Sequence, residues 1–98
     1  MSKFDSIDKV RKQIDKIDVE ILELIAKRQT LVVEAVKHKT REQIVDKKRI
    51  NKILISLKKI AQKKGLPSYI VEKVWLEMIN GFIKFEEESF DRIQNKDN

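Results

Sequence analysis

The sequence has no cysteine, one histidine, one proline and two glycines among its 98 residues. Without cysteine the chain can form neither a disulfide nor a thiolate site, and His38 alone cannot build a zinc site. So few turn-forming residues argue against a β-rich fold. No apolar run approaches the roughly 18 residues that cross a bilayer, and the first residues do not resemble a signal peptide. We therefore expect one small all-helical domain, soluble and cytoplasmic, with no metal and no membrane contact.

Basic residues outnumber acidic ones by 22 to 16, which gives a formal net charge of +6 and raises the hypothesis of nucleic-acid binding. Seventeen of the basic residues are lysines, and lysines scattered over the outer faces of helices usually form a solvated surface. The five arginines are scarcer, so their positions are more informative: Arg11, Arg28, Arg41, Arg49 and Arg92.

Three helices are predicted from the spacing of apolar residues. A heptad pattern predicts a first helix over about 5–39, capped at its start by Asp5 or Ser6. The pattern fades before a second helix over about 46–63, which Gly65 ends. Pro67 suits the first turn of a third helix over about 67–93, and a polar, frayed tail is expected at 94–98. The heptad positions of the first helix are Ile7, Val10, Ile14, Ile17, Ile21, Leu24 and Leu31.

The length of the first helix predicts a homodimer. About 34 helical residues span roughly 50 Å, whereas a compact monomer of this size is only about 30 Å across. Such a helix would extend beyond its own globule and expose its apolar stripe. We therefore expect a second copy to cover it, with the two first helices packed together.

Several charged residues occupy apolar stripes. Arg28 is in register with the heptad residues, and Lys39 lies on nearly the same face, so the two could bracket a small anion. Arg28 could equally form an internal salt bridge or extend to the edge of the stripe. Glu86 falls within a stripe on the third helix, where it could donate a hydrogen bond when neutral or pair with Arg28 or Lys39. That stripe contains Leu76, Ile79, Ile83, Phe90 and Ile93.

Two further pairs of charged residues are candidates because of their spacing in the sequence. Asp46 and Arg49 are three residues apart at the start of the second helix. They could form an ordinary ion pair on the helix surface, and the aspartate also suits a position at a helix N-terminus. Arg11 lies 17 residues before Arg28, about 26 Å along one helix. Across an antiparallel dimer, however, Arg11 of one chain can lie near Arg28 of the other.

Five stretches carry a resemblance to a known family: Val10–Asp18, Ile25–Gln29, Val36–Lys39, Val45–Arg49 and the segment from Met78 to Glu86. Together they resemble the all-helical AroQ-type chorismate mutases over roughly residues 7–90. The resemblance implies an intertwined dimer of three-helix subunits with two active sites. These sites convert chorismate to prephenate, in aromatic amino-acid biosynthesis, without a cofactor.

The resemblance also implies roles for individual residues. Arg28 and the other chain's Arg11 would bind the two substrate carboxylates. Lys39 would donate to a carboxylate and to the ether oxygen, while Asp46 would accept the ring hydroxyl and Arg49 would assist binding or hold the site in shape. Glu86 is a further candidate catalytic residue, on the hypothesis that it faces the ether oxygen. The apolar wall would include Ala35, Ile79 and Ile83.

Three positions depart from the family pattern. Glu86 stands where the family often has glutamine, Phe82 replaces a hydroxyl residue that can contact a carboxylate, and Ile50 replaces a polar residue. An aromatic residue at position 82 is compatible with a related enzyme of the same fold, an isochorismate pyruvate-lyase that forms salicylate. A non-enzymatic basic helical dimer that binds nucleic acid is the third hypothesis, and Arg28 and Glu86 on apolar stripes argue against it.

Overall fold

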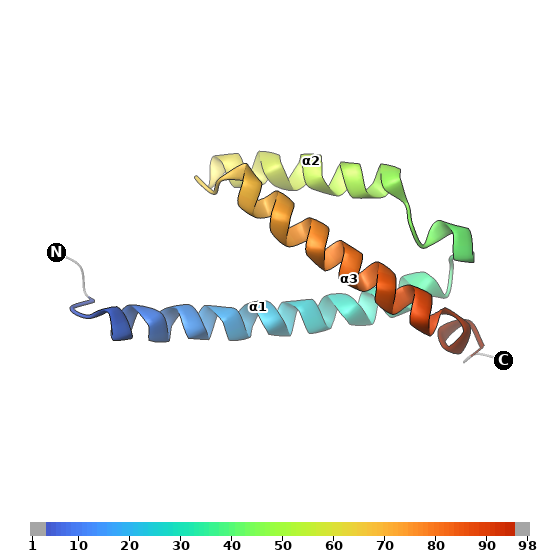
Figure 1. Ribbon diagram of the computed structural model, residues 1–98, viewed down its shortest axis with the longest axis horizontal. Helices are drawn as coiled ribbons and strands as arrows, with labels where there is room; N and C mark the ends of the chain where they lie inside the picture. The colour runs from blue at the N-terminus through green and yellow to red at the C-terminus, as the bar shows by residue number, and fades with distance from the viewer. Residues whose placement is uncertain (1–3, 96–98) are drawn as a thin grey trace. The chain divides into compact units, whose positions relative to one another are not determined.

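The computed structural model describes residues 4–95, which form three α-helices and no strand (Figure 1). The α-helices are α1 (Ile7–Val36), α2 (Lys47–Lys63) and α3 (Ser68–Asn95), and a short 3-10 helix η1 (Arg41–Gln43) lies between α1 and α2. The predicted all-α class with three helices is confirmed. The chain divides into two compact units, an N-terminal unit up to Leu31 and a C-terminal unit from Val32. The predicted single domain stays a prediction.

The helix α1 begins at Ile7 because Ser6 caps it: the Ser6 Oγ accepts a hydrogen bond from the Lys9 backbone N–H at 3.3 Å. It ends at Val36, three residues before the predicted end at 39. The reason is a tight turn in which the Lys39 N–H donates to the Val36 carbonyl at 3.1 Å, in place of the next α-helical bond. Lys39 therefore lies in a loop and not on α1.

The heptad stripe of α1 lies open to solvent along its whole length. Its seven predicted members, from Ile7 to Leu31, are between 37% and 67% exposed. No residue between 4 and 31 is buried. The N-terminal unit thus has no apolar core of its own, although its sequence has the pattern of a helix that packs against a partner.

A glycine turn joins α2 to α3. Gly65 has a φ of 72°, a left-handed backbone conformation that residues with a side chain rarely adopt. It follows the last turn of α2, as predicted. Its N–H donates to the Gln62 carbonyl at 3.2 Å, and the Leu66 N–H donates to the Ala61 carbonyl at 2.9 Å. These two bonds form a Schellman motif, which satisfies the carbonyls at the end of α2.

The core lies in the C-terminal unit, mostly along α3. Buried apolar residues come from α3, from the end of α1, from the loop and from α2: Val71, Ile79, Phe82, Ile93, Val36, Ile44 and Ala61. No helix in residues 4–95 combines the length and apolar character that a bilayer span requires.

The end of α3 corrects the predicted frayed tail. Gln94 and Asn95 belong to α3, and the Gln94 side chain makes two hydrogen bonds of 2.8 Å. The prediction was wrong there because a polar residue near a terminus can be held by a distant partner that the local sequence does not reveal. Residues 96–98 of the predicted tail lie outside the described residues.

Candidate functional site

Lys39 and Glu86 form an ion pair in the C-terminal unit. The Lys39 Nζ lies 2.9 Å from the Glu86 Oε1, although the residues are 47 positions apart in sequence. The Glu86 side chain is 7% exposed and that of Lys39 is 29% exposed. A charge-assisted hydrogen bond of this length, with one partner buried, has little water to compete with it. The pair therefore presents an ammonium group at the surface and supports it with a carboxyl group beneath.

The apolar face of α3 surrounds this carboxyl group along the helix. Phe82 lies one turn before Glu86 and is buried, Ile79 is buried one turn earlier, and Ile83 is half-buried. The Phe82 ring meets the Phe85 ring edge to face, with centroids 6.3 Å apart. Rings packed this way restrict both side chains. Glu86 is thus the charged member of a largely apolar surface, as its place in the stripe predicts, and Ser89 is a second buried polar residue on α3.

The last turns of α3 hold the loop that carries Lys39. The Gln94 Nε2 donates to the Val36 carbonyl and to the Lys39 carbonyl, each at 2.8 Å. The Arg41 guanidinium lies 2.6 Å from the Asp91 Oδ1 and 4.6 Å from the centre of the Phe90 ring. These contacts connect the loop to α3.

A local hydrogen bond closes the next turn of the loop. The Gln43 Oε1 accepts from the Thr40 N–H at 2.8 Å, and the Gln43 N–H donates to the Thr40 carbonyl at 3.0 Å. The following residue, Ile44, is buried. Together these features connect Lys39 to the start of α2 through an ordered segment.

Asp46 is the N-cap of α2. Its Oδ1 accepts a hydrogen bond from the Arg49 backbone N–H at 3.0 Å, and the Arg49 side chain is exposed. This contact is the helix-start geometry that aspartate favours, in which the carboxylate also meets the positive end of the helix dipole. A carboxylate has a second oxygen, so capping leaves Asp46 able to accept a hydrogen bond from a ligand hydroxyl.

The remaining predicted site residues lie on α1. Arg11 is exposed and Arg28 is half-buried, both within the N-terminal unit. Ala35 is exposed in the last turn of α1, within the C-terminal unit. The structure thus joins Lys39 to Glu86 directly, and it places Asp46 and Arg49 at the start of α2.

Two residues near the site are not predicted from the sequence. The sequence pattern places Gln94 in a frayed tail and Arg41 in a loop without apolar periodicity. No motif marks Gln94, because its partners lie 58 and 55 positions away. For Arg41 a weak signal existed: it is one of only five arginines, and it follows Lys39 closely.

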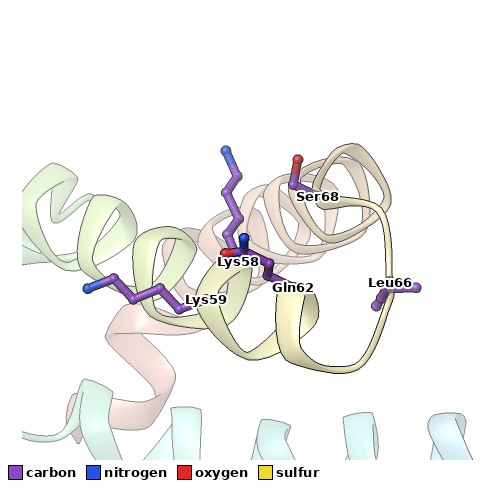
Figure 2. Close-up of a pocket in the computed structure, with 5 residues that line it drawn as sticks. All are labelled: Lys58, Lys59, Gln62, Leu66 and Ser68. Carbon is purple, nitrogen blue, oxygen red and sulfur yellow. The ribbon is translucent and has the colours of Figure 1, made fainter.

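A cavity of about 380 Å³ lies elsewhere, at the turn between α2 and α3. Figure 2 shows that Lys58 and Lys59, which line it, point in different directions. The Lys58 ammonium group is already engaged by the Glu72 carboxylate at 3.2 Å. These lysines therefore do not converge on a common ligand. Within residues 4–95 no cluster of three or more histidine or acidic side chains is arranged to hold a metal ion.

The family model described as chorismate mutase type II matches residues 10–87. No curated protein and no solved structure matches the chain. The matched range extends from one residue before Arg11 to one residue after Glu86, so it contains every residue predicted for the site.

Proposed function

The chain belongs to the chorismate mutase type II family, and on that premise we propose that it catalyses the rearrangement of chorismate to prephenate. Family membership supports a chorismate mutase-type function. The observation that carries the finer proposal is the Lys39–Glu86 pair at 2.9 Å, which supplies a fixed donor beside a buried carboxyl group. We place the reaction in the cytoplasm, in aromatic amino-acid biosynthesis.

The reaction needs orientation and electrostatic stabilisation more than covalent chemistry. Chorismate is a dianion that must fold into a compact conformation before its C–O bond breaks and its new C–C bond forms. Holding the two carboxylates removes much of the entropic barrier, and Arg28 with the partner subunit's Arg11 would perform this role. Lys39 would donate to the ether oxygen, where negative charge grows in the transition state.

The other site residues complete the pocket. Asp46 would accept the ring hydroxyl through its carboxylate, while Arg49 would assist binding from the first turn of α2. Phe82, Ile79, Ile83 and Ala35 would form the apolar wall. A wall of this kind excludes water, and the hydrogen bonds to the reacting atoms are stronger when water is excluded.

The exposed stripe on α1 supports a homodimer with shared sites. Its members are at least 37% exposed over residues 7–31, and monomeric proteins rarely leave such long apolar stripes uncovered. A second copy of α1 carries the complementary stripe. Because Arg11 and Arg28 are about 26 Å apart along one helix, only Arg11 from the partner could reach a site that contains Arg28.

Mixing two inactive variants tests the shared site. Arg11→Ala and Arg28→Ala should each be nearly inactive, and subunit exchange between them should recover about a quarter of the wild-type activity. Random exchange makes half of the dimers mixed, and each mixed dimer has one site free of both substitutions. Activity is followed by the loss of chorismate, and mass spectrometry of the intact dimers verifies exchange. Demonstrated mixed dimers without recovered activity would contradict the shared site.

Two substitutions test the role of Glu86. Glu86→Gln keeps the size and has an N–H donor that can face the ether oxygen, so it should retain activity. Glu86→Ala removes the polar group, so its kcat for chorismate should be low. Equal kcat values for the two variants, both verified as folded dimers, would show that position 86 supplies no donor to the reaction.

A substrate assay separates this proposal from its alternative. The aromatic Phe82 on the site face of α3 favours an isochorismate pyruvate-lyase as the second candidate. Purified protein is given chorismate or isochorismate, and prephenate and salicylate are quantified. Prephenate as the main product supports the proposal, and salicylate from isochorismate supports the alternative. Neither product, with affinity for nucleic acid that falls steeply with salt, would identify a basic binding dimer instead.

A further inference from the structure

Lys39 contacts α3 through both its side chain and its backbone. Its ammonium group contacts Glu86 at 2.9 Å, and its backbone carbonyl accepts from the Gln94 Nε2 at 2.8 Å. Glu86 and Gln94 both lie on α3, eight residues apart, which is about 12 Å along the helix axis. A straight helix keeps that separation constant, so the two anchors of Lys39 do not move relative to each other.

Gln94 makes a contact that the turn itself does not make. The Val36 carbonyl already accepts the Lys39 N–H at 3.1 Å, so Gln94 is a second donor there. The Lys39 carbonyl, in contrast, accepts its hydrogen bond from the Gln94 side chain. One amide group therefore joins the end of α1 to the residue whose side chain reaches Glu86.

This backbone anchor matters because a lysine side chain is flexible. Four rotatable bonds separate the backbone from Nζ, and about 2 kcal/mol of rotamer entropy opposes any single geometry. The loop has no glycine or proline. The Arg41–Asp91 pair also ties the loop to α3, but the two side chains are 54% and 79% exposed, and pairs so exposed contribute little. The part-buried Gln94 bonds are the stronger tether.

We propose that Gln94 is a positioning residue, whose amide fixes the Lys39 backbone so that the Lys39 ammonium group stays on the Glu86 carboxyl group. The importance of this for catalysis rests on the function proposed above, in which Lys39 donates to the ether oxygen. Gln94 touches no substrate in this arrangement. It acts through the geometry of Lys39.

The test replaces Gln94 with methionine, which has nearly the same shape and lacks both N–H donors. The kcat for chorismate should fall about tenfold with little change in KM, because the donor to the transition state loses its alignment. Gln62→Met is the matched control, since Gln62 is exposed on α2, and its kcat should equal that of the wild type. If Gln94→Met does not fold, Gln94→Asn retains the amide on a stem shorter by one methylene and should show the same loss of kcat.

The same substitution in a chain that lacks Lys39 distinguishes a positioning role for Gln94 from a purely structural one. In a Lys39→Met chain, adding Gln94→Met should cause no further loss of residual kcat, because Gln94 acts through Lys39. An equal loss in both backgrounds would mean that Gln94 serves only as a structural cap, and the proposal would be wrong.

Lysine-side-chain NMR gives a readout without substrate. The Lys39 ammonium resonance, assigned by its loss in Lys39→Met, should move toward those of exposed lysines in Gln94→Met and stay unchanged in Gln62→Met. If it moves while the wild type converts neither chorismate nor isochorismate, the positioning of Lys39 stands and the proposed function fails. If it does not move and kcat is unchanged, the positioning role is overturned whatever the enzyme's reaction is.

Discussion

Arg28→Ala should lower kcat/KM for chorismate at least roughly 30- to 150-fold, which corresponds to about 2–3 kcal/mol of transition-state stabilisation. In the proposed site the guanidinium binds a substrate carboxylate through paired, charge-assisted hydrogen bonds. Arg28 is half-buried on α1. After substitution by alanine, water would therefore replace the hydrogen bonds between the Arg28 guanidinium and the substrate carboxylate poorly. Steady-state kinetics with purified, dimeric variant protein measures the loss.

The control for this prediction is Arg92→Ala. Arg92 is an exposed arginine on α3, outside the proposed site, so its removal changes the net charge equally and should leave kcat/KM nearly unchanged. Comparable losses for the two variants would mean that general positive charge attracts the dianion. Raising the ionic strength distinguishes the cases further, since long-range attraction is screened by salt and a direct contact is screened much less.

Lys39→Met should lower kcat by roughly 100- to 1,000-fold, the range found when a donor to a developing oxyanion is removed. The same change should also lower the free energy of unfolding. The Glu86 side chain is only 7% exposed, and without Lys39 its carboxylate would lie buried without that partner, which costs about 3 kcal/mol or more. Denaturant titration of the wild type and the variant measures this cost.

The double variant Lys39→Met/Glu86→Gln separates the two effects. Glutamine removes the unpaired charge, so the double variant should regain most of the lost stability but none of the lost kcat. Recovery of both would show that Lys39→Met acted through misfolding. If Lys39→Met alone changed neither the free energy of unfolding nor kcat, the proposed role of the Lys39–Glu86 pair would be contradicted.

The helices were predictable because their signals are local. The heptad stripe marks α1, Gly65 marks the end of α2, and Asp46 marks its start within a few residues. Each signal comes from residues that are neighbours on one turn or one face, and such neighbours are fixed by helix geometry. The all-α class and the order of the helices follow from these signals.

The ends of α1 and α3 were not predictable in the same way. Val36 ends α1 in a tight turn, and α3 extends to Asn95, with Gln94 bonded to both Val36 and Lys39. These bonds link positions more than 50 residues apart. Their existence depends on how the C-terminal unit folds, and no local pattern encodes it.

The candidate site was partly predictable for a related reason. A carboxyl group within an apolar stripe demands a partner, so the sequence narrowed the partner of Glu86 to Arg28 or Lys39. In the structure Lys39 is at hydrogen-bond distance. Choosing between the two cations requires the path of the loop, and the Gln94 hydrogen bonds to the Val36 and Lys39 carbonyls connect that loop to α3.

The open stripe of α1 has a consequence for how the protein responds to dilution. If a second copy covers the stripe, as proposed, folding and association become one equilibrium, and mass action then sets the melting temperature. The melting temperature should rise with protein concentration, and activity per chain should decline in very dilute solution as dimers separate. The amount of active enzyme in a cell would then depend more than linearly on the number of chains made.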